Sequence, residues 1–525
     1  MNSFPWLTVL LVGTLVGAIG VACVPAAKAE LAKRAALGWS VLVLAYSIVM
    51  AFQFHAHGGV QLTETHTWIK AFGAHYAVGV DGLGLSLVLL TTILTPVVIL
   101  AGWNDGDDDE SATTRPRWKP RAFFAWLLAL EALAIGCFVA TDVFMFYVLF
   151  EVVLVPVYFL VGGFGGANRT RAAVKFLQYS LTGGLIMLAA VIGVYVESAK
   201  LAGHPTYLLS DLTQLDFSQT AGRWLFIGFF IALAIKAPIF PVHTWLPDVC
   251  EEATPGTNTL LVSVLDKIGS FGMIRFCLEL FPDAAKWATP VVVTLAIISI
   301  IYGALMAIGS DNIPRLIAYT SVSHFGFIVL GIFVMNSQGL SGANLYMFAH
   351  GLSTAAVFLV GGFLTRRGGS KLISSYGGVE KVAPVLAGLF LVGNLSLLSL
   401  PGLSPFVPEF LSIVGAFVYS PWAAAFAVTG IVLAAIYALL MYQRTMTGPA
   451  NPAFEGMKDL SVREIASVVP VMALLVVLGF APQPLMHILN PSAQHTMSEV
   501  GRHDPAPKVP DLPQRFAADS DGSAQ

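Results

Sequence analysis

The strongest constraint in this sequence is a series of long apolar stretches that recur along most of the chain. An α-helix needs about 20 apolar residues to cross the hydrocarbon core of a bilayer. Only 11% of the 525 residues are charged, whereas soluble domains average about 25%. A soluble fold of this length could not bury so much apolar surface. The sequence therefore predicts an all-α, polytopic membrane protein.

Counting stretches of this length gives about 14 membrane-spanning helices. Their approximate limits are 4–24, 36–54, 83–103, 121–140, 142–163, 172–196, 222–241, 256–281, 289–308, 314–335, 341–364, 382–400, 406–444 and 462–482. The stretch 406–444 is long enough for two spans, and prolines leave the division of 382–444 open. The tail, 491–525, is rich in Pro, Asp, Ser and Ala, a composition that predicts disorder.

Lysine and arginine are distributed unequally between the loops. The odd-numbered loops hold most of them, and the even-numbered loops hold few, namely Lys70, Lys200, Arg223 and Lys286. Cytoplasmic loops of membrane proteins carry the excess of positive charge. This bias predicts a multi-pass protein of the inner (plasma) membrane with both termini outside the cytoplasm. The net charge of −3 gives no indication of nucleic-acid binding.

Four ionisable residues lie inside predicted spans, namely Glu151, Lys236, Lys267 and Glu409. A charged side chain at the bilayer centre costs about 2.5–3.5 kcal/mol on insertion scales. Such groups face the interior of a helix bundle, find partners there and mark ion paths. The alternative is a structural ion pair, but buried pairs stabilise poorly compared with apolar replacements. The pattern therefore favours a functional site over a structural one.

Prolines interrupt the span that contains Lys236. Pro238 and Pro241 each remove a backbone donor and clash with the preceding turn, so we expect the helix to break there. Irregular backbone at membrane depth survives only inside protein or beside a water-filled cavity. Lys236 would then end the first half-helix, where the negative end of the helix dipole favours a cation.

A second interruption precedes Glu409. The segment 401–408 contains three prolines and a glycine, so the helix must stop and restart. We expect Ser404 as the N-cap and Pro405 as the first helical residue. Glu409 would then lie in the first turn, where an anion is favoured.

Two broken helices with buried charges are typical of transport through internal repeats. The breaks lie about 170 residues apart, which fits two inverted five-helix repeats. The predicted organisation is 1–120 for helices 1–3, 121–281 for the first repeat, 289–444 for the second, and 445–490 for the last helix. Helices 7 and 12 would be the broken ones, and 491–525 the disordered tail.

Two histidines, His324 and His350, also lie in apolar helices. A lone histidine there is more often packed and hydrogen-bonded than part of a relay. Together with the intramembrane lysines and glutamates, however, the two histidines form a polar series that could conduct protons. The residues alone leave both interpretations open.

The sequence shows no redox or nucleotide motif. The four cysteines lie far apart without CxxC spacing, and there is no phosphate loop, haem motif or flavin motif. We therefore expect no cofactor and no metal in this chain.

Several stretches resemble the proton-pumping subunits of respiratory complex I. They are Lys236-Ala-Pro-Ile-Phe-Pro-Val-His-Thr-Trp-Leu-Pro-Asp, Arg315-Leu-Ile-Ala-Tyr-Thr-Ser-Val-Ser-His-Phe-Gly, Ala349-His350-Gly-Leu-Ser and Pro408-Glu409-Phe. The similarity covers nearly all of 80–445. The family also includes subunits of multi-subunit sodium/proton antiporters and of membrane-bound hydrogenases. A glutamate at position 409 resembles the M type of complex I subunit, whereas the L and N types and the antiporters usually carry lysine there.

This resemblance implies a role for each buried group. Glu151 corresponds to the family's fifth-helix glutamate and Lys236 to its seventh-helix lysine. Lys267 corresponds to the eighth-helix lysine and Glu409 to the twelfth-helix glutamate. The two histidines, His324 and His350, correspond to those on the connecting path.

The resemblance also implies a function. The chain would be a proton-translocating subunit of an NADH:quinone oxidoreductase, driven by quinone reduction elsewhere in the complex. FMN, iron–sulfur clusters and quinone are expected in partner subunits. The expected partners are the L-type and N-type subunits, membrane lipid and protons, with no nucleic acid. The alternative is a subunit of a multi-subunit sodium/proton antiporter, which Glu409 argues against.

Overall fold

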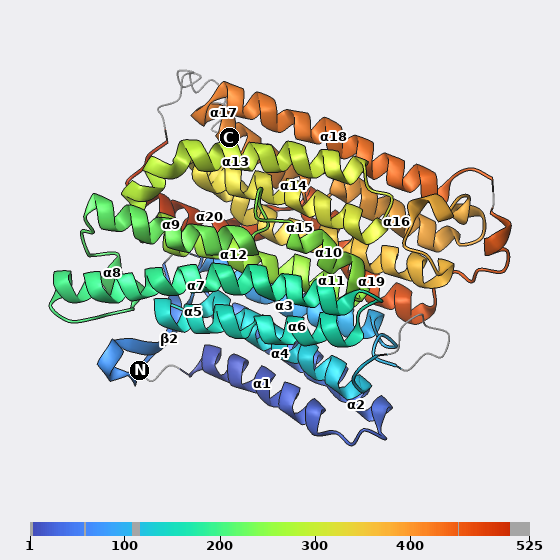
Figure 1. The fold of residues 1–525 in the computed structure, drawn as a ribbon, viewed down its shortest axis with the longest axis horizontal. Helices are drawn as coiled ribbons and strands as arrows, with labels where there is room; N and C mark the ends of the chain where they lie inside the picture. Colours follow the sequence, from blue (N-terminus) through green and yellow to red (C-terminus); the bar gives the residue numbers. More distant parts are fainter. Residues whose placement is uncertain (1–3, 57–58, 108–115, 450, 505–525) are drawn as a thin grey trace, which may run out of the picture.

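The computed structural model describes residues 4–56, 59–107, 116–449 and 451–504. Its helices run roughly parallel to one another along the longest axis of the molecule (Figure 1). Within the described residues, 11 helices are long and apolar enough to cross a membrane, and two shorter apolar helices accompany them. These helices confirm the predicted polytopic membrane class. The total of 14 spans and the inverted repeats stay predictions.

The helices and strands follow one another closely along the chain. The first half comprises α1 (Trp6–Cys23), α2 (Ala29–Ala51), β1 (Gln61–Ile69), β2 (Ala74–Val80), α3 (Gly82–Ala101), α4 (Pro120–Val139), α5 (Val143–Val152), α6 (Leu154–Phe164), α7 (Arg169–Ala202), α8 (Leu209–Leu212), α9 (Gln219–Lys236), α10 (Trp245–Glu252) and α11 (Pro255–Leu260). The second half comprises η2 (Leu261–Leu265), α12 (Asp266–Gly272), η3 (Met273–Leu278), α13 (Pro282–Ile308), α14 (Ile313–Phe333), α15 (Ser337–Gly368), α16 (Pro384–Leu397), α17 (Phe406–Tyr419), α18 (Pro421–Met446), α19 (Val462–Phe480) and α20 (Gln483–Glu499). The remaining short pieces are single 3₁₀ turns.

Polar side chains fix where several spans begin. The first N–H groups of a helix have no partner within the helix. Asp81 accepts a hydrogen bond from the backbone N–H of Gly84 at 2.9 Å and so caps α3. Ser461 and Glu464 form a reciprocal capping box at the start of α19. These caps place the helix starts at polar residues next to the apolar runs.

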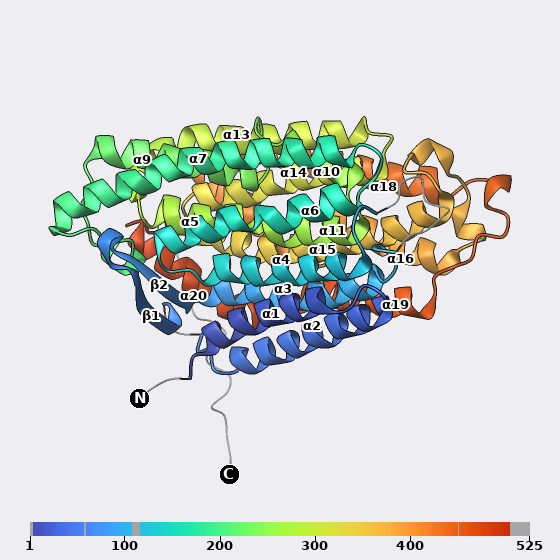
Figure 2. The same cartoon turned by 60° about the horizontal axis from the view of Figure 1, so that its bottom comes forward.

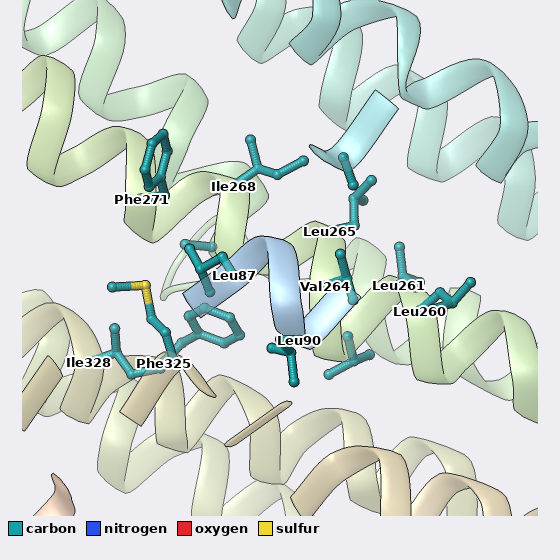
Figure 3. Packing of buried hydrophobic residues seen from close by; sticks show 14 of the residues in the cluster. Leu87, Leu90, Leu260, Leu261, Val264, Leu265, Ile268, Phe271, Phe325 and Ile328 are labelled. Atoms are coloured by element: carbon teal, nitrogen blue, oxygen red, sulfur yellow. The ribbon is translucent and has the colours of Figure 1, made fainter. Parts of the chain in front are cut away.

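The centre of the bundle is formed by α14 and α15. The most apolar stretch of each is completely buried, whereas only 39% of the corresponding stretch of α1 is buried. Figure 3 shows Leu87 and Leu90 of α3 packed between the helix around 260–271 on one side and Phe325 and Ile328 of α14 on the other. Side chains on α14 and α15 are therefore shielded from lipid by neighbouring helices.

Both predicted helix interruptions are present. Helix α9 ends at Lys236 and α10 begins at Trp245, after the two prolines. Helix α16 ends at Leu397 and α17 begins at Phe406. Each break leaves backbone carbonyl groups without partners inside the preceding helix.

One detail of the second break differs from the prediction. Glu409 lies in the first turn of α17, as expected. Ser404 is not the N-cap, because Pro405 occupies the capping position and no side chain caps this helix. The Ser404 hydroxyl oxygen is buried without a hydrogen-bond partner among the described residues. The helix begins one residue later than a Ser404 cap requires, so Ser404 lies one position before the cap.

A β-hairpin stands between α2 and α3 and was not predicted. Strands β1 and β2 pair antiparallel, with Gln61 opposite Val80 and Ile69 opposite Ala74. The hairpin lies at one end of the helix bundle, at the same end as α8 (Figure 2). Its segment is too short and too polar to cross a membrane, which is why the search for spans passed over it.

The C-terminal region also differs from the prediction. Residues 491–499 belong to helix α20, whereas the sequence predicted disorder from 491. Leu485, Leu489, Ala493 and Met497 recur every four residues on α20 and are all buried. This apolar stripe holds the helix against α15 and α3 despite its polar composition. Residues 505–525 of the predicted tail lie outside the described part.

Candidate functional site

Lys236 is buried at the end of α9. Its side chain is 1% exposed, and its Nζ has no hydrogen-bond partner among the described residues. The ammonium lies 4.8 Å from the ring centre of Phe150 and 5.8 Å from that of Phe176. Aromatic faces attract a cation at such distances. The aromatic rings therefore stabilise the ammonium charge only weakly. Lys236 has no hydrogen-bonded group among the described residues to which it could pass its proton.

Glu151 on α5 lies near Lys236 without a direct hydrogen bond. The two side chains interact electrostatically, but neither Lys236 Nζ nor Glu151 Oε1 has a hydrogen-bond partner in the described part of the chain. The carboxylate occupies space that Gly184 leaves open on α7, because a side chain at position 184 would overlap it. Glu151 is half-buried, so part of its side chain reaches the surface of this subunit. The charge of its carboxylate can therefore respond to a change in what contacts that surface.

Lys267 makes direct contact with a histidine. Its Nζ lies 2.6 Å from Nδ1 of His350 on α15 and donates to the backbone carbonyl of Val262 at 2.7 Å. Val262 lies in the π-helical turn η2, and such turns are frequent at functional sites. Lys267 and His350 are both fully buried. This pair can exchange a proton without any rearrangement of the backbone.

His324 on α14 extends the set of contacts from His350 toward the break between α16 and α17. Its ring centre lies 5.3 Å from that of His350. Its Nε2 lies 3.0 Å from the carbonyl oxygen of Leu397 and 3.2 Å from the hydroxyl of Tyr437. Leu397 is the last residue of α16, so its carbonyl is one of those that a helix end leaves free. The break in the helix thus supplies an oriented partner for the histidine.

Glu409 is held by two hydroxyl groups. Tyr346 and Ser399 each donate to its Oε2 at 2.5 Å. Tyr346 lies four residues before His350 on α15 and therefore on the same helix face. Ser399 lies within the break and has a left-handed backbone conformation (φ 54°), which a non-glycine residue adopts only where its surroundings require it.

These groups form one continuous arrangement at the centre of the bundle, which we call the polar row: Lys267, His350, His324, Tyr346 and Glu409. The structure brings four of the six predicted site residues together in this row. Lys236 and Glu151 form a separate pair that has no hydrogen bond to the polar row within the described part of the chain. The polar row links the last helix of the first predicted repeat with the break in the second.

Several buried polar residues were missed from the sequence. Tyr346, Ser399 and Tyr437 gave no signal, because single hydroxyl groups are common in apolar helices. Glu131 on α4 is 1% exposed, and both its carboxylate oxygens lack hydrogen-bond partners in the described part. It could have been found, because it lies within the predicted span 121–140 and meets the criterion that selected Glu151.

A buried ion cluster joins three distant segments. Arg275 Nη2 lies 2.6 Å from Asp81 Oδ2, and its Nη1 lies 3.0 Å from Glu279 Oε2. Thr496 of α20 donates to Glu279 at 2.7 Å. These contacts fasten the start of α3 and the helix α20 to the end of η3. The cluster is fully paired, unlike Lys236, and its geometry indicates a structural role.

Comparison with known proteins identifies the family. Residues 140–434 match the family described as NADH:quinone oxidoreductase/Mrp antiporter, transmembrane. The chain belongs to this family of membrane subunits. Within it, the chain is a homologue of NADH-quinone oxidoreductase subunit M. The subunit M of Mycobacterium tuberculosis (strain H37Rv) is 50% identical over 97% of this chain and 97% of its own.

Solved structures support the same assignment. A chain of respiratory complex I from Thermus thermophilus with bound NADH matches with a TM-score of 0.85 and 31% identity, over 94% of this chain and 100% of that chain. A chain of the Mrp complex from Dietzia sp. DQ12-45-1b matches with a TM-score of 0.82 at 20% identity, over 95% of this chain and 100% of that chain. The second match shows the shared fold alone. The resemblance to complex I subunits is therefore confirmed, and the antiporter alternative is the more distant one.

Proposed function

We propose that this chain is the M-type subunit of an NADH:quinone oxidoreductase and that it moves protons through Lys236, the polar row and Glu151. The observation that carries this proposal is the row from Lys267 to Glu409 through two histidines and a tyrosine, which is hydrogen-bonded at both ends and joined by neighbouring rings, with centres 5.3 and 6.0 Å apart, in between. Protons can pass along such groups because each can accept one and release one. The redox chemistry, with FMN, iron–sulfur clusters and quinone, would belong to partner subunits.

Glu151 and Lys236 would act as the controlling pair. A carboxylate near a buried lysine favours the protonated lysine, and its withdrawal or neutralisation favours release of the proton. Moving one charge against 100 mV costs about 2.3 kcal/mol. At an effective dielectric constant near 20, two unit charges separated by roughly 4–10 Å interact by about 2–4 kcal/mol. A change in this one interaction is therefore of the size that transport requires.

Glu409 would be the terminal acceptor of the row. Its two hydroxyl donors, Tyr346 and Ser399, stabilise the carboxylate, while burial in the bundle opposes the charge. These opposing effects suit a group that takes up and releases a proton in each cycle. Protons would arrive from Lys267 through His350 and His324.

The membrane arrangement follows from the loop charges. We propose that the chain lies in the inner (plasma) membrane with both termini outside the cytoplasm, because the odd-numbered loops hold the excess of Lys and Arg. Its partners would be the L-type and N-type subunits of the same complex. Glu151 is only half-buried within this chain, which supports contact with a neighbouring subunit, because a charge that faces lipid is costly.

Co-purification tests the choice between the two functions. A tagged chain isolated from native membranes in mild detergent is expected to bring down NADH:quinone oxidoreductase subunits, identified by mass spectrometry. A tagged unrelated membrane protein serves as the control for non-specific capture. Recovery of sodium/proton antiporter subunits in place of oxidoreductase subunits would show that the proposed function is wrong.

A further inference from the structure

A buried carboxyl group directly beside Lys267 has no role in the polar row. Asp266 is the first residue of α12 and is fully buried. Both its carboxylate oxygens lack hydrogen-bond partners among the described residues. A buried charge without hydrogen bonds is costly, and the cost is greater within a membrane. A purely structural carboxylate would be expected to have partners, as Asp81 does in the ion cluster.

The position of Asp266 on its helix directs it toward Lys236. Gly269 lies three residues later, on the same face of α12. A side chain at position 269 would overlap the backbone of Ala237 and Leu233, so this face lies directly against the end of α9. Ala237 is the residue that follows Lys236. Asp266 accordingly interacts electrostatically with Lys236.

Lys267 points to the other side of the same helix. Consecutive helix residues are rotated by about 100°, and the Lys267 ammonium lies 2.6 Å from His350 on α15. Asp266 interacts electrostatically with Lys267 as well as with Lys236. It also interacts with Cys250 on α10, beyond the break. The carboxyl group thus lies within electrostatic range of both the unpartnered lysine and the first member of the polar row.

We propose that Asp266 is an additional proton carrier that connects Lys236 to Lys267. Because the carboxylate makes no hydrogen bond to either lysine among the described residues, a water molecule relays each transfer. An N–H bond of the Lys236 ammonium breaks and an O–H bond forms on the Asp266 carboxylate, which leaves a neutral amine and a neutral acid. The O–H bond then breaks and an N–H bond forms on the neutral Lys267 amine, which restores the carboxylate. This inference rests on the proposed function and fills the gap in the path between Lys236 and the polar row.

The test compares Asp266→Asn with Asp266→Glu in the assembled complex. Asparagine keeps the shape but cannot carry the proton, whereas glutamate can. The number of protons translocated per NADH oxidised, measured in liposomes, is expected to fall about tenfold in Asp266→Asn. In Asp266→Glu it is expected to recover most of the wild-type value. Electron transfer from NADH to a soluble artificial acceptor should be unchanged in both, because it bypasses the membrane subunits.

Other outcomes would overturn the inference. Normal translocation by Asp266→Asn would show that the carboxyl carries no proton. Equal loss in Asp266→Asn and Asp266→Glu would show that Asp266 only positions its neighbours. A Glu409→Gln variant measured alongside separates the two proposals, because its normal translocation would contradict the proposed function itself.

A labelling experiment covers the case in which Asp266→Asn does not assemble. A hydrophobic carbodiimide attacks protonated carboxyl groups, so treatment of the wild-type complex during turnover is expected to modify Asp266, detected by mass spectrometry of the peptides. Modification of Glu409 without any modification of Asp266 would show that Asp266 is never protonated and would overturn the inference.

Discussion

Replacing Lys236 by methionine is expected to reduce NADH-driven proton translocation at least about tenfold while the complex assembles normally. Methionine fills the same volume among Phe150 and Phe176 and needs no partner. Assembly should be spared because Lys236 makes no hydrogen bond among the described residues that its loss could break. Translocation is measured from the acidification of inverted membrane vesicles, and assembly from native gel electrophoresis.

The control for this variant is Lys200→Met. Lys200 lies at the end of α7, its side chain is 63% exposed, and it pairs with Glu197 at 2.6 Å. Such exposed pairs contribute little, so translocation should match the wild type. Normal translocation by an assembled Lys236→Met complex would contradict the role of Lys236.

Replacing Arg275 by methionine is expected to destabilise the chain by about 3–5 kcal/mol. The change leaves Asp81 and Glu279 buried beside each other without a cation, although both are only 5% exposed. It also weakens the attachment of α20 through Thr496. We expect immunoblotting to detect little or none of this chain in purified membranes. Any complex that remains should have a lower midpoint of thermal unfolding.

Lys286→Met serves as the control for Arg275, since the Lys286–Asp283 pair is long (3.4 Å) and its aspartate is exposed. It should cost less than about 1 kcal/mol. The combined change Arg275→Met, Asp81→Asn and Glu279→Gln should recover part of the lost protein, because no uncompensated charge remains. Wild-type levels of the Arg275→Met chain would show that the cluster does not hold these segments together.

The broken helices could be predicted because proline acts locally. The ring of Pro238 or Pro241 disrupts the helix in which it lies whatever the neighbours are. The end of α9 at Lys236 and the place of Glu409 in the first turn of α17 therefore followed from the sequence. The exact start of α17 did not, because the cap at Ser404 depended on how the loop packs.

The polar row could be predicted only in part. Charged residues in an apolar span stand out because their cost is high, and this criterion found Lys267 and Glu409. Burial of the Tyr346 hydroxyl carries no such cost when the hydroxyl is hydrogen-bonded. A tyrosine in an apolar span therefore does not stand out, and the role of Tyr346 is visible only in its contact with Glu409. The ion cluster required contacts between segments about 200 residues apart or more, namely Arg275 with Asp81 and Glu279 with Thr496, which no single-sequence pattern reveals.

The hairpin and α20 were missed for a related reason. Both are too polar to cross a membrane, so neither gave a signal in a search for apolar spans. Their positions are set by packing against the bundle, as when Leu489 and Met497 of α20 are buried against it. Tertiary contacts, rather than local composition, decide the structure of such segments.

The most direct test of the central claim is the number of protons translocated per NADH oxidised by the purified complex in liposomes. It is measured for the wild type, Lys236→Met, Glu409→Gln and the double variant. If both groups lie on one path through this chain, the double variant should lose no more than the more impaired single variant. If the loss in the double variant equals the product of the two single fold-losses, the groups serve separate paths and a continuous path through this chain is contradicted.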